Sequence, residues 1–137
     1  MENDAWAVYV LFLEQNKFYI GSIPEKNLDE RLQKHFNNQG SAWSQKYHPL
    51  KTSRPIITCG LTKNEADLKE HELTYFYMKT YGIDNCRGHI YSQITLSLGE
   101  LQAITKRIAH DQSLCFNCFN PGHYMKSCLE RLTSYNY

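Results

Sequence analysis

Long hydrophobic runs are missing from this sequence, since no apolar stretch approaches the roughly 18 residues that a membrane-spanning helix needs. The first residues, MENDAW, also lack the cationic start of a secretory signal peptide. There is no internal repeat and no low-complexity segment, which argues against a repeat architecture. The net charge of only +1 predicts no general affinity for nucleic acid. A membrane protein, a secreted protein and a polybasic binder are therefore not expected.

The residues that are present favour a globular domain. Of the 137 residues, 42% are hydrophobic and 13% are aromatic, so the chain can bury a core and is not a disordered polypeptide. This length allows one domain of about a hundred residues with small appendages. Three of the five cysteines cluster near the C-terminus. The other two, Cys59 and Cys86, are expected to be buried, reduced thiols in an intracellular compartment, either nucleus or cytoplasm.

Charge is distributed unevenly along the chain. Residues 26–54 contain six Lys or Arg and two acids, whereas residues 65–72 contain four acids. A basic segment that faces an acidic one suits a phosphate held near a metal ion. A solvated surface without function would give the same counts.

Apolar periodicity and turn residues predict a small α/β domain followed by a linking helix. Residues 90–96 fit either a short strand or a packed loop. The expected segments are strands 6–13, 17–23 and 56–61, and helices 27–36, 65–80 and 97–113.

Residue types at the segment ends support this division. Asn27 is the expected N-cap of the first helix, with Glu30 three residues on. Gly82 is expected to stop the second helix. Ser97 and Glu100 form the pattern of a capping box at the start of the third helix.

A cluster of metal ligands follows the third helix. Three thiolates and one imidazole would saturate a tetrahedral Zn²⁺ and leave no open position for catalysis. The ligands, in the pattern C-x2-C-x4-H-x4-C, are Cys115, Cys118, His123 and Cys128. This spacing resembles the retroviral-type zinc knuckle, and Gly122 fits that resemblance, whereas Phe119 stands where the family usually has glycine. The resemblance implies that Phe116 and Tyr124 stack on unpaired bases. A redox-labile cysteine cluster or a protein-docking knot are the alternatives.

Two tyrosines lie on the first two expected strands. Tyr9 ends the segment AVY and Tyr19 begins the segment YIG, ten residues further on. This pair of segments resembles the signature of the GIY-YIG nuclease family, with Ala7 in place of the first glycine. The resemblance covers roughly residues 6–86. It implies a three-stranded antiparallel sheet flanked by helices, and hydrolysis of nucleic-acid phosphodiesters with one divalent metal ion.

The resemblance also selects catalytic residues. Arg31 and His35 match the family's arginine and following histidine, and they share a helix face because they are four residues apart. Glu70, in ADLKEH, matches the metal-binding glutamate, which would hold Mg²⁺ or Mn²⁺. Arg31 would bind phosphate through its planar fork. Tyr9 would be the general base or water positioner, with Tyr19 and His35 as phosphate or proton-shuttle contacts.

Further residues are expected to bind substrate. The loop GSAWSQKYHPLK resembles that of branch resolvases, which implies substrate contacts by Trp43 and Lys46. Asn85 resembles the family's late asparagine. Gly21 would allow the backbone to approach substrate without a Cβ. Taken singly, Tyr9, Tyr19, His35 and Trp43 can each be explained by packing. Arg31 can be explained as a solvated helix charge, and Glu70 as a salt-bridge partner of Arg31 without a metal.

These patterns predict a metal-dependent and structure-directed endonuclease acting on DNA, whose knuckle grips single strands or flaps. A non-catalytic protein that binds DNA or RNA is the alternative, and a protein-interaction scaffold is a third. The stretch YGIDNCRG and the single knuckle resemble small GIY-YIG proteins of large DNA viruses. The expected divisions are a nuclease domain at 1–96, a linking helix at 97–113, a knuckle at 114–129 and a short tail at 130–137.

Overall fold

A computed structural model describes residues 4–111 of the chain. The chain divides into two compact units after Ile94. The expected zinc ligands and the aromatic residues Phe116 and Tyr124 lie outside the described residues. The elements of the first unit, in chain order, are β1 (Trp6–Leu13), β2 (Lys17–Pro24), α1 (Leu28–Phe36), α2 (Ala42–Lys46), β3 (Ile56–Leu61), α3 (Lys63–Tyr81) and β4 (Cys86–Gly88).

These elements form an α/β fold around a four-stranded sheet with the strand order β3-β1-β2-β4. Strand β1 pairs antiparallel with both β2 and β3, as expected. The expectation of a purely antiparallel three-stranded sheet is incomplete, because β4 pairs parallel with β2 and makes the sheet mixed. This strand has only three residues, and its sequence CRG lacks the β-branched and aromatic residues that indicate strands. The chain at residues 90–96 is a loop with one bridge at Tyr91.

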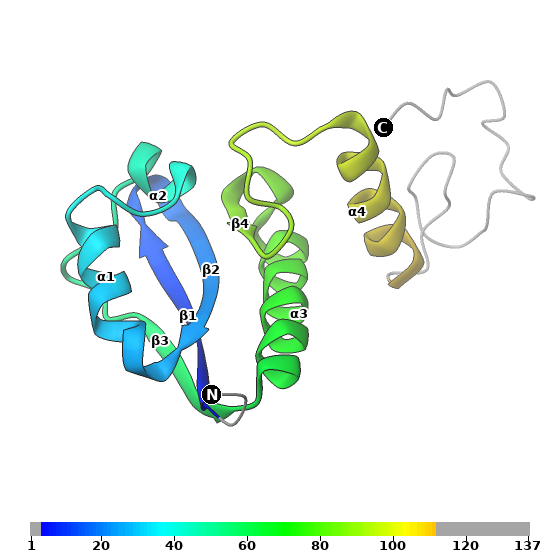
Figure 1. The fold of residues 1–137 in the computed structure, drawn as a ribbon. Coiled ribbons are helices and arrows are strands. Elements are labelled where there is room, and N and C mark those ends of the chain that lie inside the picture. The colour runs from blue at the N-terminus through cyan, green and yellow to red at the C-terminus, as the bar shows by residue number, and fades with distance from the viewer. Residues whose placement is uncertain (1–3, 112–137) are drawn as a thin grey trace, which may run out of the picture. The chain divides into compact units, whose positions relative to one another are not determined.

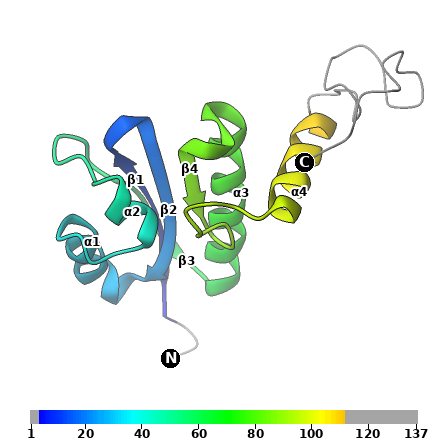
Figure 2. The same ribbon diagram turned by 90° about the horizontal axis from the view of Figure 1, so that it is seen from above.

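Helices cover both faces of the sheet, with α1 and α2 on one face and α3 on the other (Figures 1 and 2). Side chains alternate between the two faces along each strand. On the α1 and α2 face, Tyr9 and Tyr19 join a buried cluster with Leu11, Leu28 and Trp43. Burying apolar and aromatic surface on both faces is what holds the short strands together. The two tyrosines are therefore core residues as well as candidates for catalysis.

The helix boundaries show which of the predicted capping residues act as caps. Asn27 does not cap α1 with its side chain, so that prediction is wrong, and the residue lies in a short 3-10 turn that leads into the helix. Helix α3 begins two residues earlier than predicted because Thr62 and Glu65 form a capping box. It ends at Gly82, whose φ of 111° favours glycine, as predicted.

A buried arginine forms hydrogen bonds that hold the segment after α3 in place. Arg87 is 2% exposed. Its guanidinium donates to backbone carbonyls on both sides of it in the chain, including Ile83 and Ile94 at 2.6 and 3.0 Å. The same group lies 4.5 Å from the centre of the Trp43 ring. A buried cation is tolerated only with this number of partners, so Arg87 joins the end of α3 to the α2 segment.

The two cysteines among the described residues differ in exposure. Cys86 is buried as expected, whereas Cys59 is exposed, because it lies on the edge strand β3, where the side chains of several residues face solvent. No helix within residues 4–111 is long and apolar enough to cross a membrane.

In the second unit, the structure describes helix α4 (Leu98–Asp111). Its predicted capping box is confirmed, since Ser97 and Glu100 each accept from the other's backbone N–H.

Candidate active site

Tyr9 stands at the start of a buried chain of hydrogen bonds. Its hydroxyl lies 2.9 Å from Nε2 of His35, and Nδ1 of His35 lies 2.9 Å from Oγ of Ser44. Ser44 Oγ donates to the Ser41 carbonyl, so it accepts from His35 Nδ1. This leaves Nε2 without a hydrogen and able to accept from the Tyr9 hydroxyl. His35 is 0% exposed, so it acts on Tyr9 from inside the core and does not reach a substrate directly.

The charge states of this chain follow from burial. Burial, with the charge of Arg31 adding to it, lowers the pKa of His35 to about 4, so the imidazole is neutral at neutral pH. Burial, together with the neighbouring Tyr19, raises the pKa of Tyr9 above its ordinary value. Burial likewise raises the pKa of Tyr19. At rest, the Tyr9 and Tyr19 side chains are therefore protonated phenols.

Arg31 is the positive charge next to both phenols. Burial lowers the pKa of its guanidinium, but hydrogen bonds and charge interactions with Tyr9 and Tyr19 outweigh this and raise the pKa. The guanidinium is therefore always charged. Arg31 also lines an open pocket of about 340 Å³ with Ser22, Lys34 and three other residues. The same side chain thus contacts both the buried phenols and the solvent-filled pocket.

Glu70 reaches the site from α3. Tyr19 and Ser22 are three residues apart on β2 and so face opposite sides of the sheet. On the α3 side, Ser22 Oγ donates to Glu70 Oε1 at 2.8 Å. Burial raises the pKa of Glu70, and the Ser22 hydrogen bond partly opposes this rise. The charge of Glu70 in turn raises the pKa of both phenols, so the carboxylate is electrostatically coupled to them across the strand.

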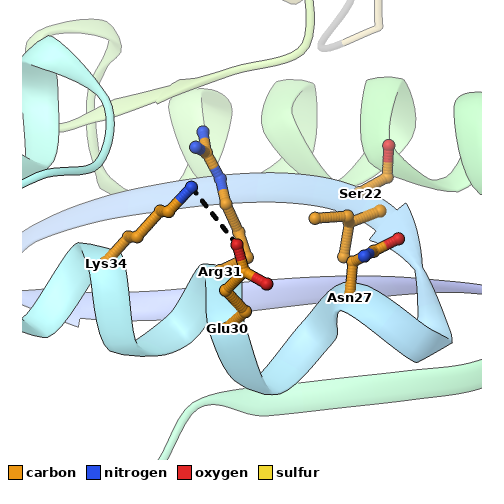
Figure 3. A pocket seen from close by; sticks show the side chains of 6 residues that line it. Ser22, Asn27, Glu30, Arg31 and Lys34 are labelled. Atoms are coloured by element: carbon orange, nitrogen blue, oxygen red, sulfur yellow. Dashed lines mark ion pairs between the residues drawn. The ribbon is translucent and has the colours of Figure 1, made fainter.

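The open edge of β2 allows groups from both faces to meet. Strand β4 pairs with residues 18–20 of β2, and within residues 4–111 no other strand covers that edge at residues 21–24. Figure 3 shows Arg31 rising from α1 over β2, while Ser22 points away from α1. Asn27 and the ion-paired Lys34 and Glu30 complete the rim of the pocket. A substrate phosphate at this edge would lie between a guanidinium and a carboxylate.

Trp43, Lys46 and Asn85 are the other predicted substrate contacts. Trp43 is 2% exposed and donates from Nε1 to the Phe18 carbonyl, so its ring offers no accessible face to a substrate. Lys46 is exposed, with its Nζ 5.5 Å from the centre of the Tyr47 ring. Asn85 follows the C-terminal end of α3, and the part of α3 between Glu70 and its last residue, Tyr81, rises about 16 Å. Trp43 therefore packs in the same core cluster as Tyr9 and Tyr19, whereas Asn85 lies beyond the far end of α3 from Glu70.

Asn85 forms hydrogen bonds with two other residues. Its Oδ1 accepts from Lys17 Nζ at 2.6 Å, and its Nδ2 donates to the Tyr81 carbonyl at 2.6 Å. The residue thus ties the end of α3 to the start of β2.

Sequence reasoning missed several residues that build the site. Ser22 and Ser44 are small polar residues without a helical or strand periodicity of their own, and Ser22 meets a partner 48 positions away. Gly21 was expected to admit substrate, but a Cβ there would overlap the Tyr9 ring, and Tyr9 is its cross-strand partner. Gly40 has the same relation to the His35 ring. Both glycines make room for the rings of Tyr9 and His35.

The fold and this cluster define a small α/β domain with a charged polar site at the edge of its sheet. Residues 5–81, more than half of the 137-residue chain, match the family described as the GIY-YIG catalytic domain, and the chain belongs to that family. At family level the domain is an endonuclease-type hydrolase with nucleic acid as its substrate. Comparison with curated proteins gave no match, and comparison with solved structures gave none either.

The role of Gly21 can be tested by adding one methyl group. Gly21→Ala is expected to lower the free energy of unfolding by about 1–3 kcal/mol, since the Tyr9 ring must move out of a packed core. Cleavage should fall as well. Gly99→Ala is the control, because a Cβ at Gly99 meets nothing within 4 Å. Chemical denaturation monitored by circular dichroism measures both effects. Unchanged stability in Gly21→Ala would contradict the packing described here.

Because the imidazole of His35 is buried, the free energy of unfolding is expected to depend on pH. The pKa of His35 falls from 6.5 to about 4 on folding, so the unfolded state binds more protons between these values. Stability is then unaffected by His35 above its unfolded pKa, and it decreases as the pH falls toward the folded pKa. Between pH 7 and pH 4.5 the loss should be about 2–3 kcal/mol.

His35→Gln provides the comparison for this prediction. The variant is expected to be less stable at pH 7, but to lose less stability on acidification than the wild type. Glu70 and any other carboxylate that titrates in this range contribute equally to both proteins and cancel in the difference. Urea unfolding of both proteins at pH 7 and pH 4.5 measures this difference in the loss of stability. An identical loss in the two proteins would mean that His35 is not held neutral.

Proposed function

We propose that this protein is a metal-dependent endonuclease that cleaves branched or flapped DNA, with a zinc-bound knuckle that grips the unpaired strand. The observation that carries the catalytic part is the cluster of Tyr9, His35 and Arg31 on one face of the sheet, to which Glu70 is electrostatically coupled from the other face. The knuckle part depends on the spacing of Cys115, Cys118, His123 and Cys128. Cysteines that bind zinc as thiolates, and are not paired in disulfides, suit an intracellular, reducing compartment.

Tyr9 and His35 can move a proton away from an attacking water. A phenol whose pKa is raised is a poor base when it acts alone. Tyr9 is 1% exposed in the free protein, so this role requires substrate binding to open the site around its hydroxyl. Tyr9 would then accept a proton from water while its own hydroxyl proton passes to Nε2 of His35. Burial is the larger cause of the low pKa of His35 in the free protein, and the charge of Arg31 adds to it. The negative charge of a bound phosphodiester would offset the contribution of Arg31. Substrate binding therefore makes the imidazole a better proton acceptor.

Arg31 would bind the oxygens of the substrate phosphate, and Glu70 would bind the metal ion beside it. The Arg31 guanidinium contacts both phenols and lines the pocket, so it can donate to phosphate oxygens as negative charge develops on them. Glu70, fixed by Ser22, is the carboxylate that would hold a divalent cation, and its hard oxygens fit such an ion. When bound, the cation neutralises charge on the phosphate and on the leaving oxygen.

A cleavage assay on defined substrates tests the proposal. Purified protein with Mg²⁺ or Mn²⁺ is incubated with labelled single-stranded, duplex, flap and junction DNA, and with the matching RNA. We expect divalent-dependent cuts in the flap or junction DNA. Tyr9→Phe is the matched control, since it removes the hydroxyl alone and keeps the ring in its core position. Binding without any cleavage would favour the alternative, a non-catalytic nucleic-acid-binding protein.

The knuckle is tested in the full chain. Replacing Phe116 and Tyr124 with Ala removes two aromatic surfaces, and each stacked base is worth about 1–3 kcal/mol. Binding to flaps should therefore weaken about five- to a hundredfold, while blunt duplex is bound nearly as before. Native mass spectrometry should find one Zn²⁺ per chain, lost in Cys118→Ser. Unchanged binding to flaps would instead support a protein-docking role for the knuckle.

A further inference from the structure

A group of metal-binding side chains surrounds Glu70 on the α3 side of the sheet. Asp67 and Glu70 are three residues apart on α3 and share a helix face. His89 comes from the turn that follows β4. One ligand atom from each of these three residues lies within 4.8 Å of the others. Two carboxylates and an imidazole at this separation can bind a single cation.

The fold itself brings His89 to α3. Gly88 and Tyr91 exchange backbone hydrogen bonds of 2.9 and 2.8 Å, which closes a tight turn. A Cβ on Gly88 would lie 2.5 Å from the Ile20 carbonyl oxygen and 2.7 Å from Thr74 Oγ1, so only glycine lets β4 approach α3 this closely. His89 follows directly, with a φ of 51° that few residue types tolerate.

We propose that Asp67 and His89 bind the catalytic divalent cation together with Glu70, and that this set of ligands selects Mn²⁺ over Mg²⁺. The inference rests on the proposed nuclease function for its catalytic meaning. Mg²⁺ prefers oxygen ligands and is commonly held by one or two carboxylates. An imidazole nitrogen raises affinity for transition ions relative to Mg²⁺. Three protein ligands would leave about three octahedral positions for water and phosphate oxygens.

Each of the three side chains has contacts that suit this role. In the free protein, His89 Nε2 donates to Asp67 Oδ1 at 2.9 Å, since a carboxylate can only accept. A cation would take the place of that hydrogen between the same two atoms. His89 Nδ1 lies 3.2 Å from Nδ1 of His71, which gives the metal-bound imidazole an orienting partner. Ser22 orients Glu70 in the same way.

The alternative explanation is a simple ion pair between His89 and Asp67. The Asp67 side chain is 70% exposed, and an exposed pair contributes little to stability. An ion pair between two residues does not account for the third ligand atom, from Glu70. The two explanations differ in what happens to Mn²⁺ binding when one ligand is replaced.

The test measures Mn²⁺ binding to the zinc-loaded full chain by electron paramagnetic resonance, with Mg²⁺ as competitor. We expect Mn²⁺ to bind at least about tenfold more tightly than Mg²⁺, and Asp67→Asn or His89→Asn to weaken Mn²⁺ about ten- to a hundredfold. Asn is chosen at position 89 because it tolerates a positive φ. Pulsed measurements should detect nitrogen coupling to Mn²⁺ in the wild type and not in His89→Asn. His48→Asn, which removes an exposed histidine from another loop, is the matched control.

Three outcomes are distinguishable. Weakened Mn²⁺ binding in both Asn variants, with circular dichroism showing that they remain folded, supports the inference. Binding that depends on Glu70 but not on Asp67 or His89 overturns it, and metal-dependent cleavage would then leave the nuclease proposal intact. Mn²⁺ binding with nitrogen coupling but no cleavage of any nucleic acid would overturn the nuclease proposal and leave this metal site standing.

Discussion

Glu70→Gln is expected to abolish cleavage, with a loss of at least about a thousandfold in rate. The substitution removes the charge that would hold the catalytic cation but keeps an oxygen that can accept from Ser22. The fold should therefore be unaffected or slightly stabilised, because burial already disfavours a charge at this position. Substrate should bind as well as before or more tightly, since a negative charge near the phosphate is removed. Single-turnover cleavage and binding assays measure the two effects separately.

Glu72→Gln is the control for this prediction. Glu72 lies two residues further along α3 and points about 200° away from Glu70 in a regular helix. It is exposed, so the substitution changes the net charge by the same amount without touching the site. Loss of activity in Glu72→Gln, with normal activity in Glu70→Gln, would show that the wrong carboxylate has been assigned.

Arg31→Ala should lower the rate by on the order of a hundredfold or more, because its guanidinium stabilises negative charge that develops on the phosphate. Arg31→Lys should recover little of this loss, since a point charge cannot replace a planar fork that also contacts Tyr9 and Tyr19. The rate constant at saturating substrate is the measurement. A nearly complete rescue by lysine would mean that only the positive charge matters.

Arg54→Ala serves as the charge-matched control, because Arg54 is an exposed residue outside the site. Arg31 is half-buried and interacts electrostatically with both phenols, so a small fall in melting temperature is expected in Arg31→Ala. The assay is run well below that temperature. Activity that returns when the variant is stabilised by cooling would point to a purely structural role.

The sequence predicts the central part of this fold well, because its signals are local and regular. The apolar and aromatic residues of 6–13 and 17–24 alternate between two buried faces, and a three-residue turn joins them. Arg31 and His35 share a helix face by spacing alone. Ala66 and Glu70 are four residues apart and share a face of α3, on which Ala66 is buried and Glu70 is half-buried. For these residues, a local pattern and the tertiary contact agree.

The remaining features depend on contacts between distant residues, which a single sequence does not reveal. His35 faces into the core instead of the substrate because Tyr9 and Ser44 lie on either side of its ring. Trp43 is buried because Arg87, forty-four residues later, packs on it. Strand β4 gives no sequence signal because it is short and forms only through its pairing with β2. These contacts are tertiary, so periodicity could not show them.

The order of strands in the sheet has a consequence for how the site resists local opening. Strands β1 and β2, which carry Tyr9 and Tyr19, occupy the two interior positions, whereas β3 and β4 are the edges. Interior strands exchange their amide hydrogens slowly, because the surrounding pairs must open first. The amides of Val8 and Val10 should therefore be among the last in the domain to exchange with deuterium, well after those of Ile57 and Cys59 on the edge. The rings of Tyr9 and Tyr19 would therefore lie on the strands that open least often. The edge strands and the loops would be the parts that adjust to substrates of different shape.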